Sequence, residues 1–246
     1  MKLMPSIASA DPLAVGEVLK KLEAWPYLHI DIEDGNFVPN ITFGMKAVRA
    51  ICKKAGKRYI QVHLMVTHPE TYLDGLAACG VDSVIAHLEA LDYPLHFLNH
   101  CRALGLEPGL AVNIKTPVEA VKPFLGNMDQ LLLMTSEPDY LEEKVYGPAV
   151  ERLIRLAGNI PAGVELYADG GVTRETLQEL ERAGVHGAVL GRLVFQSPDP
   201  LEMLKELKHS GDMSRVFKKD FDIFFRKKGN FNRPSAENPK ANISSC

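Results

Sequence analysis

The stretch Gln130-Leu131-Leu132-Leu133-Met134 indicates which class of fold this chain adopts. It is apolar almost throughout, which is typical of a parallel strand that is buried on both faces. Parallel strands need crossover connections, and these are usually helical. We therefore expect helices on both sides of this run, and more strands of the same kind beyond them.

The rest of the chain repeats this alternation of short β-rich runs with stretches of helical periodicity. The predicted strands are Leu3–Ala8, Tyr27–Ile32, Tyr59–Val66, Ser83–His87, Glu107–Val112, Gln130–Met134, Val164–Ala168 and Gly187–Leu190. The predicted helices are Pro12–Ala24, Met45–Lys54, Pro69–Cys79, Pro94–Leu104, Val118–Leu125, Tyr140–Ala157, Thr173–Ala183 and Pro198–His209. Eight such units in 246 residues favour an α/β fold of one closed (β/α)8 TIM barrel. An open doubly wound sheet is the alternative.

Residues at the ends of several predicted helices support this assignment. Thr116-Pro117 and Ser197-Pro198 have the pattern of an N-cap followed by proline in the first turn. Thr173 is expected to open another helix, and Gly80 and Gly184 suit left-handed C-caps.

Composition and charge restrict the function classes. The chain is 46% hydrophobic and 24% charged, with a net charge of -3, which does not favour nucleic acid or an anionic membrane as a partner. It has neither a signal peptide pattern nor an apolar stretch long enough to span a membrane. Its four cysteines form no C-x-x-C motif. We therefore expect a cytoplasmic enzyme with a small-molecule substrate.

The C-terminal segment departs from the alternating pattern. We predict a barrel domain over residues 1–210 and a basic, aromatic, partly flexible extension over residues 211–246. From Ser214 to Cys246 the segment has eight Lys or Arg against three Asp or Glu. The extension is interpreted as an extra helix that packs on the barrel or on a neighbouring subunit. An anion-binding or active-site role is the alternative.

Polar residues interrupt three of the apolar strands near their carboxyl ends, where a barrel carries its catalytic groups. His29 and Asp31 are two residues apart in the second strand and point the same way, while His63 lies in the third and Asp169 after the seventh. Two imidazoles and two carboxylates at one mouth can bind zinc, iron, manganese or cobalt. A structural role for each residue is the competing interpretation.

Several of these strands resemble the ribulose-phosphate 3-epimerase family, over a span from about Pro5 to Pro200. The longest and most specific match is His29-Ile30-Asp31-Ile32-Glu33-Asp34-Gly35-Asn36-Phe37-Val38-Pro39-Asn40. Shorter matches are Pro5-Ser6-Ile7-Ala8-Ser9-Ala10-Asp11, Val62-His63-Leu64-Met65-Val66, His87-Leu88-Glu89-Ala90 and Ala168-Asp169-Gly170-Gly171-Val172.

The resemblance implies roles for individual residues. The implied ligands of one divalent metal ion are His29, Asp31, His63 and Asp169, and the implied acid and base are Asp31 and Asp169. The implied substrate contacts include Ser6, Met65 and Met134. Related epimerases form dimers or hexamers, so a homo-oligomer is expected.

The sequence departs from the family at two places. Family members usually carry methionine at the position of Glu33, which is either an extra acid, ligand or substrate contact, or a residue that turns to solvent. The glycine-rich phosphate loop of the family is replaced by the acidic segment 137–143, which would repel a phosphate. Other phosphate-binding elements remain as Gly170-Gly171 and Gly191-Arg192. Arg192 either binds phosphate or opens the last helix at the surface.

The leading hypothesis is therefore a metal-dependent epimerase that inverts C3 of a ketose phosphate, by default D-ribulose 5-phosphate to D-xylulose 5-phosphate. Two carboxylates would exchange protons on opposite faces of an enediolate. The alternatives are an epimerase of another ketose or ketose phosphate, a lyase related to barrel decarboxylases, and a non-catalytic sugar-phosphate-binding barrel. The decarboxylases carry an Asp-x-Lys-x-x-Asp pattern, and this chain has Glu33 at the lysine position.

Overall fold

The computed structural model describes residues 1–137 and 144–210, and Met1–Lys208 form one compact unit. The predicted extension 211–246 and most of the acidic segment 137–143 lie outside the described residues. The boundary between the barrel and the extension stays a prediction.

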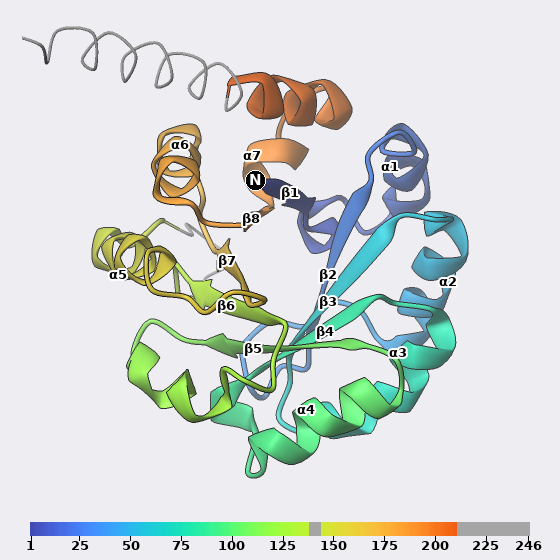
Figure 1. The fold of residues 1–246 in the computed structure, drawn as a ribbon. Coiled ribbons are helices and arrows are strands. Elements are labelled where there is room, and N and C mark those ends of the chain that lie inside the picture. Colours follow the sequence, from blue (N-terminus) through green and yellow to red (C-terminus); the bar gives the residue numbers. More distant parts are fainter. Residues whose placement is uncertain (138–143, 211–246) are drawn as a thin grey trace, which may run out of the picture. The chain divides into compact units, whose positions relative to one another are not determined.

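Eight parallel strands form one sheet in the order β1-β8-β7-β6-β5-β4-β3-β2. An isolated bridge between Ser6 and His29 joins the two ends of this order, so the sheet curls into a nearly closed barrel (Figure 1). The strands are β1 Lys2–Pro5, β2 Tyr27–Glu33, β3 Tyr59–Met65, β4 Ser83–His87, β5 Glu107–Val112, β6 Gln130–Met134, β7 Glu165–Asp169 and β8 Gly187–Leu190. The predicted (β/α)8 TIM barrel is confirmed.

Helices surround the ring of strands (Figure 1). The α-helices are α1 Val15–Lys21, α2 Met45–Ala55, α3 Leu73–Cys79, α4 Pro94–Ala103, α5 Gly147–Ala157, α6 Arg174–Ala183 and α7 Arg192–Phe195, and residues 200–208 are also helical. Four 3-10 helices are η1 Ile7–Ser9, η2 Pro69–Tyr72, η3 Leu88–Ala90 and η4 Val118–Phe124. In the described ranges no helix combines the length and apolar character that a bilayer span needs.

The two-residue period of the strands divides the side chains between two layers. Leu28, Ile30 and Ile32 of β2 belong to the larger hydrophobic cluster, which lies between the strands and the helices. A smaller cluster inside the barrel includes Met4, Leu132 and Tyr167. The side chains that alternate with the outward set of β2 therefore project into the barrel, and these are His29, Asp31 and Glu33.

Several predicted element boundaries were wrong for local reasons. The first strand ends at Pro5 rather than Ala8, because the chain turns into η1. Segment Val118–Phe124 is a 3-10 helix, since Pro123 lacks the N–H that an α-helix needs there. Helix α5 begins at Gly147 rather than Tyr140, with proline in its first turn, and Tyr140 itself lies outside the described residues.

Two predicted N-caps were also wrong. Thr116 donates its hydroxyl hydrogen bond to Glu89 instead of capping a helix. The last described helix is capped by Asp199, whose Oδ1 accepts from the N–H groups of Leu201 and Glu202, rather than by Ser197. The cap at Thr173 and the left-handed C-caps at Gly80 and Gly184 are confirmed.

Candidate active site

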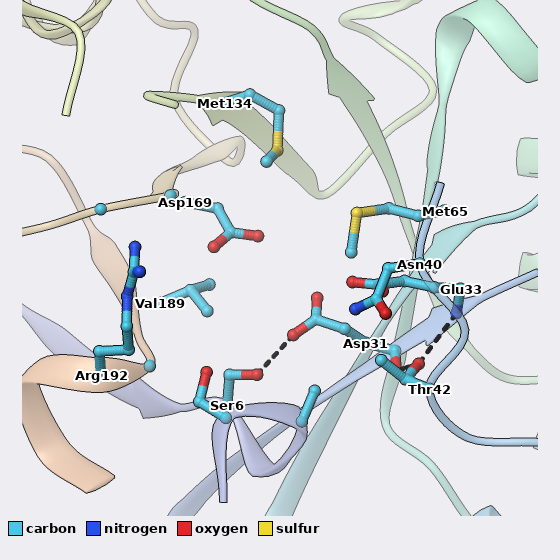
Figure 2. Close-up of a pocket in the computed structure, with 15 residues that line it drawn as sticks. Ser6, Asp31, Glu33, Asn40, Thr42, Met65, Met134, Asp169, Val189 and Arg192 are labelled. Carbon is cyan, nitrogen blue, oxygen red and sulfur yellow. Dashed lines mark hydrogen bonds between the residues drawn. The ribbon is translucent and has the colours of Figure 1, made fainter. Parts of the chain in front are cut away.

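A cavity of about 260 Å³ opens where the carboxyl ends of the strands meet (Figure 2). Ten of the residues singled out in the sequence line it, namely Ser6, Asp31, Glu33, Met65, Met134, Asp169, Gly170, Gly171, Gly191 and Arg192. The two remaining residues, His29 and His63, are fully buried. The structure therefore brings the whole predicted set to one place.

Strand register explains how the four candidate metal ligands meet. Asp31 of β2 is paired with His63 of β3, and His29 lies two residues earlier on the same inward face of β2. Asp169 ends β7, and its carboxylate faces that of Asp31 across the pocket (Figure 2). One ligand atom from each of the four residues lies within 4.8 Å of the others, and all four side chains are buried.

Hydrogen bonds orient both imidazoles toward the carboxylates. His29 Nε2 lies 3.0 Å from Asp31 Oδ1, while its Nδ1 lies 2.8 Å from Gln61 Oε1. His63 Nδ1 lies 3.2 Å from both Asp31 Oδ1 and Asp169 Oδ2. Each histidine thus presents one nitrogen to the cluster and uses the other for a hydrogen bond away from it.

The charges within this cluster favour a cation. Burial opposes protonation of His63, but the hydrogen bonds that its ring donates to Asp169 and Asp31, together with the charges of these carboxylates, outweigh it and raise the pKa of His63. The pKa of His29 is raised in the same way, chiefly by Asp31. Burial opposes ionisation of Asp31, yet both histidines lower its pKa. Two carboxylates and two nitrogen donors at this spacing suit zinc, iron, manganese or cobalt, so the residues fit a divalent ion.

The neighbours of Asp31 hold it in position. Ser6 Oγ donates a hydrogen bond to Asp31 Oδ2. Thr42 Oγ1 donates to the backbone oxygen of Asp31 at 2.6 Å and accepts from the N–H of Glu33 at 3.0 Å. The loop after β2 therefore folds back over the strand end that carries the carboxylate.

Glu33 turns into the pocket and not toward solvent. Its side chain lies beside Met65 and Asn40 in Figure 2, and Asn40 hydrogen-bonds to it. Its Oε2 atom is buried and has no hydrogen-bond partner within the described residues. Burial and the charge of Asp31 raise the pKa of Glu33 to about 7. The pocket thus contains a carboxyl group that a bound molecule can satisfy.

Glu33→Met is expected to stabilise the metal-free protein at pH 8 more than at pH 5. Because the folded-state pKa lies above the ordinary value of 4.5, the folded state loses stability as pH rises from about 4.5 to 7 and stays weakened above that. After a discount for partial exposure, the gain at pH 8 is about 1 kcal/mol, or roughly 2–4 °C in Tm. Thermal unfolding at both pH values measures this gain in stability, and Glu33→Gln is the isosteric control. An equal gain at both would contradict the pKa assignment.

The opposite side of the pocket is built from glycines and an arginine. Gly170 has a φ of 106°, and a Cβ atom there would lie 2.8 Å from the backbone nitrogen of Ser136, so no other residue fits. A Cβ on Gly191 would collide with the Ser9 hydroxyl. Arg192 begins α7, and its side chain lies on the same side of the pocket as Asp169 (Figure 2). Arg192 gives this end of the pocket a positive charge, and the glycines let a ligand approach the backbone closely.

The sequence analysis missed some residues of the pocket. Asn40, Thr42, Ser9 and Val189 also line it. Asn40 is the last residue of the long motif that begins at His29, so its place in that motif could have identified it as a pocket residue. Thr42 lies beyond the motif, and only the fold of the loop reveals its contacts.

Comparisons with known proteins identify relatives of this chain. The model of the ribulose-phosphate 3 epimerase family matches residues 2–195. A ribulose-phosphate 3-epimerase from Rhodobacter capsulatus is 36% identical over 80% of this chain and 86% of its own length. A ribulose-phosphate 3-epimerase from Schizosaccharomyces pombe is 32% identical over 85% of this chain and 93% of its own length.

A solved structure matches the fold at lower identity. Orotidine 5'-phosphate decarboxylase from Pyrococcus horikoshii OT3 superposes with a TM-score of 0.61 at 14% identity. The match covers 85% of this chain and 99% of that protein. At this identity the likeness supports the barrel fold alone.

Proposed function

Because the chain belongs to the ribulose-phosphate 3-epimerase family, we propose that it inverts the C3 centre of a ketose phosphate, by default interconverting D-ribulose 5-phosphate and D-xylulose 5-phosphate. The family consists of carbohydrate epimerases, so the chain is an isomerase, as the sequence predicted. The observation that carries the finer proposal is the pair Asp31 and Asp169, which face each other across the pocket.

Inversion next to a ketone needs one proton-transfer group on each face of a planar intermediate. Asp31 comes from β2 and Asp169 from β7, so the substrate carbon lies between them when it occupies the pocket. One carboxylate removes the C3 proton, and the other delivers a proton from the opposite side. His29, Asp31, His63 and Asp169 would hold a divalent ion, which would supply positive charge beside the oxygen that becomes negative as the C3 proton leaves.

Other residues orient the substrate and exclude water from the reacting carbon. Ser6 holds one Asp31 oxygen by its hydrogen bond, which leaves the carboxylate in a fixed direction. The thioethers of Met65 and Met134 project into the pocket from β3 and β6. They provide an apolar wall, and a water-poor environment strengthens the electrostatic contacts of the site.

The glycine and arginine end of the pocket supports a phosphorylated substrate. Gly170, Gly171 and Gly191 let backbone approach the ligand, and the Arg192 guanidinium can bind phosphate oxygens bidentately. Glu137, the described start of the acidic segment, is exposed. The other acidic residues that were predicted to repel a phosphate lie outside the described ranges.

Glu33 favours a second candidate, an epimerase for a different ketose or ketose phosphate. Its buried Oε2 lacks a partner among the described residues, and a substrate hydroxyl would supply one. A lyase has only fold-level support, because the lysine of the decarboxylase pattern is replaced by Glu33. A non-catalytic barrel does not require the four-ligand cluster that this chain carries.

The test is solvent exchange at C3. The purified protein, with its metal content determined, is incubated with D-ribulose 5-phosphate in deuterated water, and NMR and mass spectrometry follow deuterium and product. Deuterium at C3 together with xylulose 5-phosphate is the expected result. If the protein binds metal but no exchange occurs, D-ribulose 5-phosphate is not the substrate. A panel of other ketoses and ketose phosphates would then be assayed in the same way. No exchange with any of them would overturn the proposal.

A further inference from the structure

A line of hydrogen bonds leads away from the candidate metal cluster on the side of His63. His63 Nε2, the nitrogen that faces away from the carboxylates, lies 3.0 Å from Nε2 of His87, and the two ring planes are inclined by 26° with centroids 4.9 Å apart. His87 Nδ1 lies 3.3 Å from Glu89 Oε2. His87 is the last residue of β4 and is 1% exposed, so the contact between the two imidazoles is shielded from water, whereas Glu89 lies at the surface end of the line.

The positions of protons along this line follow from the chemistry of imidazole. A neutral ring has one N–H and one lone pair, so when the Nδ1 of His63 coordinates a metal, its proton must be on Nε2. That N–H can be donated only if Nε2 of His87 is an acceptor. The proton of His87 is then on Nδ1, where the carboxylate of Glu89 accepts it. Glu89 thus favours one tautomer in both rings.

Glu89 is itself fixed at its far oxygen. Its Oε1 accepts from the N–H of Asn113 at 2.9 Å and from the hydroxyl of Thr116. Arg152 of α5 in turn donates to the backbone oxygens of Asn113, Ile114 and Thr116. The loop after β5 therefore anchors the carboxylate, which uses both of its oxygens.

The other histidine ligand has a different support. His29 Nδ1 bonds to Gln61 Oε1, Gln61 Nε2 donates to Gln130 Oε1, and Gln130 Nε2 donates to Glu107 Oε2 at 3.2 Å. Two neutral amides therefore separate this histidine from a carboxylate. In the line through His63, by contrast, a single imidazole separates the candidate ligand from the carboxylate of Glu89. A carboxylate behind a metal-binding histidine fixes its tautomer and raises its basicity.

We propose that His87 and Glu89 are positioning residues that hold His63 with its Nδ1 lone pair in the cluster and thereby strengthen metal binding. This rests on the metal site of the proposed function. Phe37 supports the arrangement, since its ring packs on that of His87 with centroids 4.8 Å apart and covers it from the loop after β2.

Glu89→Gln tests the proposal with little change of shape. Glutamine has one acceptor oxygen where Glu89 uses two, so either His87 or the Asn113 and Thr116 donors must face an amide NH₂. We expect Co²⁺ and Zn²⁺ to bind about 10–100-fold more weakly, the usual effect of losing such a partner. The metal-free protein is titrated in competition with a chromophoric chelator, and the visible spectrum of bound Co²⁺ reports the ligand geometry.

A second variant and a matched control separate this role from general destabilisation. His87→Phe keeps a ring but removes the acceptor for His63. We expect it to lower metal affinity at least as much as Glu89→Gln does. The double variant with both substitutions should bind metal no more weakly than His87→Phe alone. Glu165→Gln removes a carboxylate that accepts from Tyr167 and Lys2 outside this line, and its affinity should equal that of the wild type.

The outcomes separate the two proposals. If the wild type binds no divalent ion, the proposed metal site itself fails. If the wild type binds Co²⁺, and folded Glu89→Gln and His87→Phe bind it with unchanged affinity and spectrum, the positioning role is overturned while the metal site stands. Circular dichroism melts of the metal-free variants establish that they are folded.

Discussion

Asp169→Asn is expected to lower the rate of epimerisation by about 10³-fold, which is within the usual range for loss of a general acid or base. Asparagine keeps the shape of the side chain but cannot accept the C3 proton. Since Asp169 is also a candidate metal ligand, the assay is run at saturating metal, with bound metal measured.

The pattern of exchange in this variant is more informative than the rate. Asp31 is intact, so one of the two epimers should still exchange its C3 proton with deuterated water, although it is not inverted. The other epimer should lose exchange. NMR of each epimer, incubated separately, measures this.

Asp129→Asn provides the matched control. Asp129 pairs with Arg102 on the outside of the barrel, so this variant should behave as the wild type. Unimpaired interconversion by Asp169→Asn would exclude Asp169 as the second proton-transfer group.

Removal of the divalent ion by a chelator is expected to reduce epimerisation by about 10³-fold, because stabilisation of the developing oxyanion is worth several kcal/mol. Addition of one equivalent of zinc, iron, manganese or cobalt should restore activity. The ion should also stabilise the fold, by about 2.7 kcal/mol when it is present at 100 times its Kd. Thermal unfolding with and without the ion measures this second effect.

The thermal measurement does not depend on the substrate, so it tests the site even if the true ketose is a different one. A variant with His29→Gln and His63→Gln loses both nitrogen ligands and is the control for the shift in Tm. Full activity after complete removal of metal, established by elemental analysis, would contradict the proposed mechanism.

The sequence by itself determined the barrel and the residues that gather at its mouth. Runs such as Gln130–Met134 have the composition of buried parallel strands, and their alternation with helices leaves few possible topologies. The two-residue period places His29, Asp31 and Glu33 on one face of β2 whatever the rest of the chain does. Because catalytic groups of barrels lie at the strand ends, the candidate site followed from these two facts and the family resemblance.

Only the tertiary structure decided what each of those side chains contacts. The pairing of Asp31 with His63 and the bond from Ser6 to Asp31 depend on strand register and on closure of the sheet, which join residues distant in sequence. The hydrogen bond between Glu33 and Asn40 depends on the loop after β2. The line from His63 through His87 to Glu89 depends on the pairing of β3 with β4 and on the loop after β5. Strand periodicity fixes the direction of a side chain, whereas its hydrogen-bond partner and its pKa depend on groups that only folding brings within reach.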